Sequence, residues 1–147
     1  MRLDRVAALL GLPPAGLAQT QPTDVTVVRG ACQPQSALTE DERKTPFDCD
    51  SAVFAFFDLQ NSHIMIQFAK KGDDHVPMLG FAGTMEKDGQ TLDIDRIYLE
   101  PGKPQAAEQV SCKLTFEAPH ITGVDCDVQA ALQKASAKVV FKAAPGQ

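Results

Sequence analysis

The chain has 147 residues, of which 44% are hydrophobic and 22% are charged. This length and composition allow one folded domain with a sizeable core. The formal net charge of -5 argues against a surface that neutralises nucleic-acid phosphates or anionic lipids, because such surfaces need clustered lysine and arginine. An acidic surface would suit a basic protein partner instead.

The N-terminus has the order of charged, apolar and small residues that is typical of a secretory signal peptide. Arg2 and Arg5 precede the apolar run 6–12, and small residues follow before a polar segment begins. We therefore expect residues 1–18 to be a signal peptide and residues 19–147 to form a single periplasmic or secreted domain; a disordered N-terminus is the alternative. No other run approaches the ~20 apolar residues of a membrane helix, so no membrane span is expected.

Branched side chains over residues 24–29 predict a first strand, which we expect to end at Gly30. The polar stretch 32–49 that follows reads as a long loop. Within it, Thr39 and Glu42 have the spacing of a capping box, which predicts one or two helical turns.

A hairpin is expected over residues 52–69, with Asn61-Ser62 as a two-residue turn. In that register Leu59 faces Ile64 and Phe57 faces Ile66 on one apolar face. Three large apolar side chains then occupy the opposite face, which the protein, a partner or a ligand must cover. They are Phe54, Phe56 and Met65.

A further hairpin is expected over residues 78–99, because Asp88-Gly89 is a strong turn signal between two apolar-rich runs. The alternation of apolar and polar residues slips near Asp95-Arg96, which predicts a β-bulge. Gly80 and Gly83 in the first of the two strands indicate a close backbone approach or a bend.

The segment 112–126, CKLTFEAPHITGVDC, predicts a hairpin folded at Pro119. Its register places three pairs on one buried face: Cys112 with Cys126, Leu114 with Val124, and Phe116 with Thr122. Residues 127–135 carry helix formers and are expected to be a short helix or a loop, and residues 138–142 predict a last strand.

Four cysteines permit three disulfide pairings. The hairpin register favours Cys112 with Cys126, which leaves Cys32 with Cys49. An even number of cysteines beside a signal-like segment indicates an oxidising compartment. A metal site is the rival interpretation, but the chain has no CxxC pair and no histidine at ligand spacing from a cysteine.

No motif of an enzyme or a cofactor site is evident: the chain lacks a GxSxG nucleophile motif, a phosphate loop and a dinucleotide fingerprint. Asp73, Asp74 and His75 are adjacent, and adjacent side chains point apart, so an exposed loop is the simpler interpretation. We therefore expect no enzymatic activity, no cofactor and no metal site.

The densest polar group on an expected strand is the candidate binding patch, although an ordinary solvated sheet face has the same pattern. It consists of Asp93, Asp95, Arg96 and Tyr98 on that strand, together with Lys103 in the turn that follows.

Successive hairpins flanked by two further strands predict an all-β fold, a small antiparallel barrel of about eight strands stapled by two disulfides, with a two-sheet sandwich as the alternative. For such a scaffold without catalytic motifs we expect a binding module that acts through surface loops, for example as an enzyme inhibitor. The alternative is a carrier of a small hydrophobic ligand, with Phe54, Phe56, Met65 and Phe81 lining a barrel cavity.

In outline, an acidic, disulfide-bearing small barrel is similar to the bacterial periplasmic inhibitors of c-type lysozyme. That resemblance is one of fold and not of sequence motifs. It implies a basic enzyme as the partner.

Overall fold

The computed structural model describes residues 22–57, 63–70, 79–100, 103–132 and 134–146, and within them it contains ten strands and no helix. The strands are β1 (Asp24–Cys32), β2 (Ala37–Glu40), β3 (Arg43–Pro46), β4 (Ser51–Phe56), β5 (His63–Ala69), β6 (Leu79–Met85), β7 (Leu92–Glu100), β8 (Lys103–Glu117), β9 (His120–Ala130) and β10 (Ala135–Ala143). The predicted signal peptide, residues 1–18, lies outside the described residues.

All the strands belong to one antiparallel sheet that curls into a small barrel. Its order is β1-β4-β5-β6-β7-β8-β9-β10-β2-β3, and an additional pairing of β1 with β10 makes a ring of the eight strands other than β2 and β3. That closing contact is short, because only Gly30, Ala31 and Cys32 of β1 pair with β10. The ring is therefore partial, and the predicted all-β barrel is confirmed.

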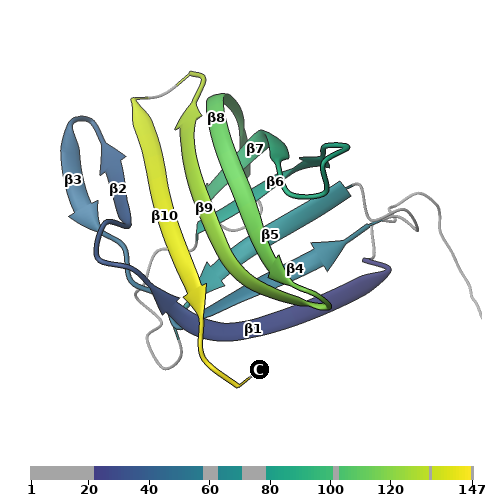
Figure 1. Cartoon of the computed structure of the whole chain (residues 1–147). Helices are drawn as coiled ribbons and strands as arrows, with labels where there is room; N and C mark the ends of the chain where they lie inside the picture. Colours follow the sequence, from purple (N-terminus) through teal and green to yellow (C-terminus); the bar gives the residue numbers. More distant parts are fainter. Residues whose placement is uncertain (1–21, 58–62, 71–78, 101–102, 133, 147) are drawn as a thin grey trace, which may run out of the picture.

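Two strands serve as corners because each pairs with different neighbours along its length. β1 pairs with β4 over Asp24–Arg29 and with β10 from Gly30 onward. β8 pairs with β7 over its first residues and with β9 over the remainder. Figure 1 shows the result: β8, β9 and β10 cross over β4 and β5, so the barrel is flattened into two layers.

The interior is filled by side chains that alternate inward along the strands of the ring, apart from the bulges. Phe68 lies at the centre of an aromatic cluster, with ring centroids 6.5 Å from Phe47, 6.0 Å from Phe81 and 6.2 Å from Phe141. Phe54 and Phe81 are fully buried in the same core. The rings meet edge-on or tilted, which is the favourable arrangement for aromatic pairs.

The predicted register of the β4–β5 hairpin is wrong. Phe54 pairs with Ile66 and Ala52 with Phe68, a shift of three residues from the expected pairing. A shift by an odd number exchanges the two faces of a strand, so Phe54 points into the core and Phe56 is half-buried, whereas Met65 does lie on the outer face. The Asn61-Ser62 turn lies outside the described residues.

The predicted helical turn between the first two cysteines is also wrong. This stretch forms the β2–β3 hairpin, in which Asp41 and Glu42 have φ of 49° and 69°. Two successive positive φ angles are the signature of a type I′ turn, which matches the twist of a two-stranded ribbon. Cross-strand pairing with β10 holds β2 in place, so tertiary contacts override the local capping signal.

Two further expectations about strand ends are corrected. β1 does not stop at Gly30 but continues to Cys32, because pairing with β10 takes over there. Residues 127–130, expected to be a short helix or a loop, are the end of β9: Val128 and Ala130 point inward while Asp127 and Gln129 are exposed. That period of two satisfies strand pairing on both edges of β9, which outweighs the helix propensity of the segment.

The β6–β7 hairpin turns at Asp88-Gly89 and has its bulge where the alternation predicts it. Ala82 pairs with Arg96 and Gly83 with Ile94, which leaves Asp95 as the extra residue. At this bulge a Cβ atom on Gly83 would lie 2.1 Å from the carbonyl oxygen of Asp93, so only glycine fits.

Both predicted disulfides are confirmed, Cys32–Cys49 and Cys112–Cys126. The β8–β9 register is confirmed at Cys112–Cys126 and Leu114–Val124. It is wrong at Phe116, which pairs with Ile121 because a bulge follows Thr115. Phe116 lies near the tip of this hairpin, on the same face as Ile121, and its side chain is 39% exposed.

Candidate functional site: the barrel seam

The polar patch predicted from the sequence lies on the outer face of β7 and the start of β8. Asp93, Asp95 and Arg96 are exposed, and Arg96 Nε lies 3.3 Å from Asp95 Oδ1 in a solvated ion pair. Tyr98 lies opposite Gly80 on one side and Pro104 on the other, and Lys103 pairs with Glu100. β7 thus places Asp93, Asp95, Arg96 and Tyr98 on its outer face, but neither these residues nor Lys103 line either of the two described grooves.

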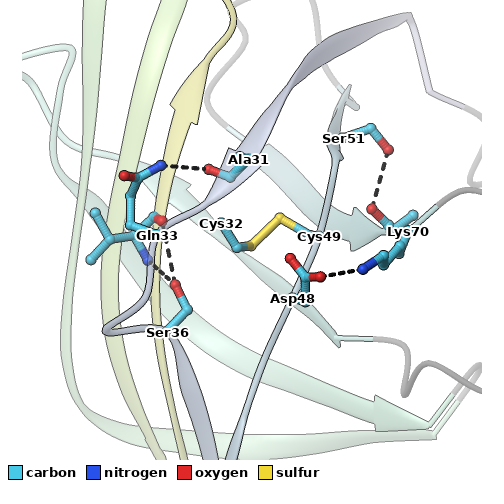
Figure 2. The surroundings of a disulfide bond; sticks show 10 residues. Ala31, Cys32, Gln33, Ser36, Asp48, Cys49, Ser51 and Lys70 are labelled. Atoms are coloured by element: carbon cyan, nitrogen blue, oxygen red, sulfur yellow. Dashed lines mark hydrogen bonds and ion pairs between the residues drawn. A yellow bond between two sulfur atoms is a disulfide. The ribbon is translucent and has the colours of Figure 1, made fainter.

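The segment closed by Cys32–Cys49 is held by its own polar contacts, which Figure 2 shows around the disulfide. The side chain of Lys70 bonds the Asp48 carboxylate, and this hydrogen bond holds the pKa of Asp48 below its usual value. Ser36 is 1% exposed; its hydroxyl accepts from the amide of Val140 at 3.0 Å. These contacts fix the segment against β5 and β10, so we assign them a structural role.

The seam is the place where the ring of strands stops being paired. β10 lies between β9 and β1 and pairs with both until Lys142 and Ala143. Beyond Ala143 the chain leaves the sheet in a turn at Pro145-Gly146. We define the seam as the space between β1 residues 24–28 and the β8–β9 tip, residues 116–122.

Two grooves meet at the seam and share His120 and Ile121. The first, about 700 Å³, lies between β1 and the β8–β9 tip, and we call it the seam groove. Its apolar lining residues are Val27, Val28, Phe56, Met85, Phe116, Pro119 and Ile121. The second, about 710 Å³, follows the end of β10 along residues 140–146. Both grooves border the end of the strand ring at which β10 stops.

Apolar side chains are exposed around the seam. Val25 is 50% exposed, Val27 is 60% exposed and Phe116 is 39% exposed. These three account for all but one of the large exposed hydrophobic residues in the described part of the chain, the other being Leu132 in the β9–β10 connection. Grouped exposure of this kind marks interaction sites more often than scattered single residues do.

The charges at the two grooves are mainly acidic. Asp24 lines the seam groove, and Glu117 and Asp125 line the adjoining one, where Lys142 is the basic counterpart. His120 lies on the boundary between the two. The seam therefore combines an apolar floor with carboxylates at its rim.

The described residues hold no group of three or more His, Cys, Asp or Glu side chains placed to bind a metal ion. The sequence candidates Asp73, Asp74 and His75 lie outside those residues. Over the same described ranges, no helix is long and apolar enough to cross a membrane.

Sequence reasoning identified the strand over residues 24–29 but not its open edge. Whether a strand is an edge depends on its neighbours, and the neighbours of β1 are β4 and β10, far along the chain. The one local signal was the run Val25, Val27 and Val28, in which apolar residues occupy both faces of a single strand.

Comparison of the chain with protein-family models, curated proteins and solved structures returned no match. The two disulfides are consistent with an extracellular or otherwise oxidising compartment.

Proposed function

We propose that the protein is a periplasmic or secreted binding module, and that it recognises a partner protein at the seam. The observation that carries the proposal is the coincidence of an apolar groove, exposed Val25, Val27 and Phe116, and an interrupted strand ring at one place. Interaction sites on monomers are commonly apolar patches with polar rims.

A rigid framework supports this role. The fully buried rings of Phe54, Phe68, Phe81 and Phe141 fill the interior, and two disulfides close the segments 32–49 and 112–126. A recognition surface on such a scaffold loses little conformational entropy when a partner binds. Enzyme inhibitors commonly use a preorganised surface of this kind, so inhibition of a basic enzyme is the specific form we favour.

Site-specific photo-crosslinking tests the proposal. Phe116 is replaced by p-benzoylphenylalanine, and Leu132, which is 93% exposed, carries the same group in a matched control. In the cells that make the protein, we expect irradiation to give one adduct of discrete mass at position 116 and none at position 132. No adduct at position 116, or the same adducts at both positions, would contradict a partner site at the seam.

A small hydrophobic ligand is the second candidate, favoured by the volume and lining of the seam groove. About 700 Å³ lies within the ~300–1,000 Å³ range of small-molecule sites, and barrel mouths are common locations for them. Of the residues expected to line a cavity, Phe56 does line this groove, whereas Phe54 and Phe81 belong to the packed core.

Fluorescence of 1-anilinonaphthalene-8-sulfonate separates the two candidates. A carrier would bind the probe with one-to-one stoichiometry and release it when laurate is added, and Phe56→Asp would abolish binding. Absence of a saturable probe signal would remove the carrier candidate and leave protein recognition.

A further inference from the structure

The seam has the position of a missing strand. β10 separates β9 from β1, and it ends where Ala143 pairs with Gly30. Beyond the end of β10, β1 still runs on toward its first residue, Asp24, and β9 toward its first residue, His120. The edges of these two strands therefore lie on either side of the line that a longer β10 would follow. A strand placed on that line would be antiparallel to both neighbours, as β10 is.

The backbone of β1 offers hydrogen-bonding groups on that side. The Gly30 amide donates to Asp50 O on the β4 side at 3.0 Å, whereas Arg29 O accepts from the Ala144 amide on the β10 side at 2.8 Å. The backbone N–H and C=O groups of successive residues in a strand point to alternate sides. The amides and carbonyls of Val25 and Val27 therefore point to the same side as the Arg29 carbonyl. Over residues 24–28, β1 pairs with β4 on one side, and on the other side it pairs with no described strand.

The side chains around the seam select a pattern in any added strand. Inward positions would lie over Val28, Phe56 and Ile121, which favours apolar residues. Outward positions would lie beside Val25 or Val27, and the seam carries the carboxylates of Asp24, which lines the seam groove, and of Glu117 at the β8–β9 tip. Lysine and arginine suit those positions, because the aliphatic stem covers apolar surface while the charged end pairs with a carboxylate.

We propose that the seam binds an extended, basic segment of a partner protein by strand addition to the open edge of β1. This inference rests on the proposed function and specifies how the partner protein binds. Residues 24–28 provide about 16 Å of edge at ~3.3 Å per residue, enough for a segment of about five residues. Main-chain hydrogen bonds would supply affinity, and the alternating side chains would supply specificity.

Selection from a phage-displayed library of random heptapeptides tests the proposal on the intact chain. We expect enriched sequences with apolar residues at alternate positions and lysine or arginine between them. A synthetic copy of the best peptide is then compared with the same peptide N-methylated at alternate residues, which removes backbone donors and keeps the side chains. Binding of the N-methylated peptide should be weaker by about tenfold or more, since several backbone bonds are lost.

Two substitutions at Val27 test the same contact from the protein side. Val27→Pro removes an amide that points into the seam and leaves the hydrogen bonds of β1 to β4 intact. An edge strand tolerates proline at a position whose amide points away from the sheet. Val27→Thr is the matched control, because it keeps the amide and the β-branched shape. We expect Val27→Pro to weaken the peptide about tenfold or more and Val27→Thr to weaken it less. If Val27→Pro does not fold, the N-methylated peptide decides alone.

Failure of this inference is distinguishable from failure of the proposed function. No enriched peptide, or equal binding of the N-methylated form, would overturn strand addition. A discrete crosslink at position 116 together with either result would keep the partner site and remove this mode of binding. Loss of both the crosslink and the peptide would remove both proposals.

Discussion

Gly30 of β1 pairs with Ala143 of β10, and the two backbones approach so closely that a Cβ atom on Gly30 would lie 2.0 Å from the carbonyl oxygen of Lys142. At this contact β1 leaves β4 and joins β10, so it closes the ring and ends the seam. Any side chain at position 30 must push one of the two strands away.

Gly30→Ala is therefore expected to destabilise the protein by about 1–3 kcal/mol or more, the usual cost of overpacking. Gly80→Ala is the matched control, because its Cβ atom would lie 3.3 Å from the nearest backbone oxygen, that of Ile66. Urea unfolding of both variants measures the difference. Equal midpoints would show that β1 and β10 are not held together at Gly30.

β10 pairs with β2 over Ala135–Lys138 and with β1 over Phe141–Ala143, and between these two stretches the buried hydroxyl of Ser36 bonds the β10 backbone. It accepts from the Val140 amide at 3.0 Å, and Val140 O accepts from the Gln33 amide at 2.7 Å. Ser36→Ala leaves the amide without that partner, so we expect a loss of about 1–3 kcal/mol in the free energy of unfolding. Ser51→Ala is the control, since Ser51 makes an exposed hydrogen bond of 3.4 Å and should cost little.

Phe68 joins three other rings at the centre of the core, and Phe116 lies at the seam. We expect Phe68→Ala to cost about 3–5 kcal/mol, because it leaves a cavity in packed surroundings. Phe116→Ala should cost far less stability and yet weaken partner or peptide binding. Chemical unfolding and binding measured on the same samples test this division; a large stability loss for Phe116→Ala would instead make that ring part of the core.

Acid titration should report on the turn at Asp88. The Thr91 hydroxyl, at 2.6 Å, and the amides of Thr91 and Gln90, each at 2.8 Å, donate to its carboxylate and lower its pKa from 3.8 to about 2. The folded-state pKa lies below the unfolded one, so this stabilisation is present above pH 3.8 and is lost as the pH falls to about 2.

Asp88→Asn keeps an oxygen for the backbone amides but does not titrate. Its free energy of unfolding should therefore fall less than that of the wild type between pH 3.8 and about 2. Urea unfolding at several pH values measures both slopes. Identical slopes would show that Asp88 titrates alike in the folded and unfolded chains.

The parts of the fold that could be predicted are those in which two local signals agree. In the β8–β9 hairpin, one register joins Cys112 to Cys126 and also puts Leu114 and Val124 on the same face, and the structure has that register. The bulge at Asp95 was predictable because the alternation changes phase there.

Errors arose where the sequence allowed two answers. Residues 52–57 are apolar at every position, so both registers of the β4–β5 hairpin bury an apolar face. Packing of Phe54 and Phe68 in the barrel core decides between them. The seam could not be predicted from the sequence for a different reason. A neighbouring strand covers the side of β1 opposite to β4 only as far as β10 extends. The end of β10 lies more than a hundred positions from Val25 and Val27 in the sequence.

Amide hydrogen exchange of Val27 compared with Val28 tests the central claim, an open β1 edge at the seam, most directly. By the alternation of backbone directions, the Val28 amide points to β4 and the Val27 amide into the seam. In the free protein we predict fast exchange at Val25 and Val27 and strong protection at Thr26 and Val28, with protection appearing at Val25 and Val27 when the selected peptide binds. Equal protection of Val27 and Val28 in the free protein would contradict the account, because it would mean that this edge is already occupied.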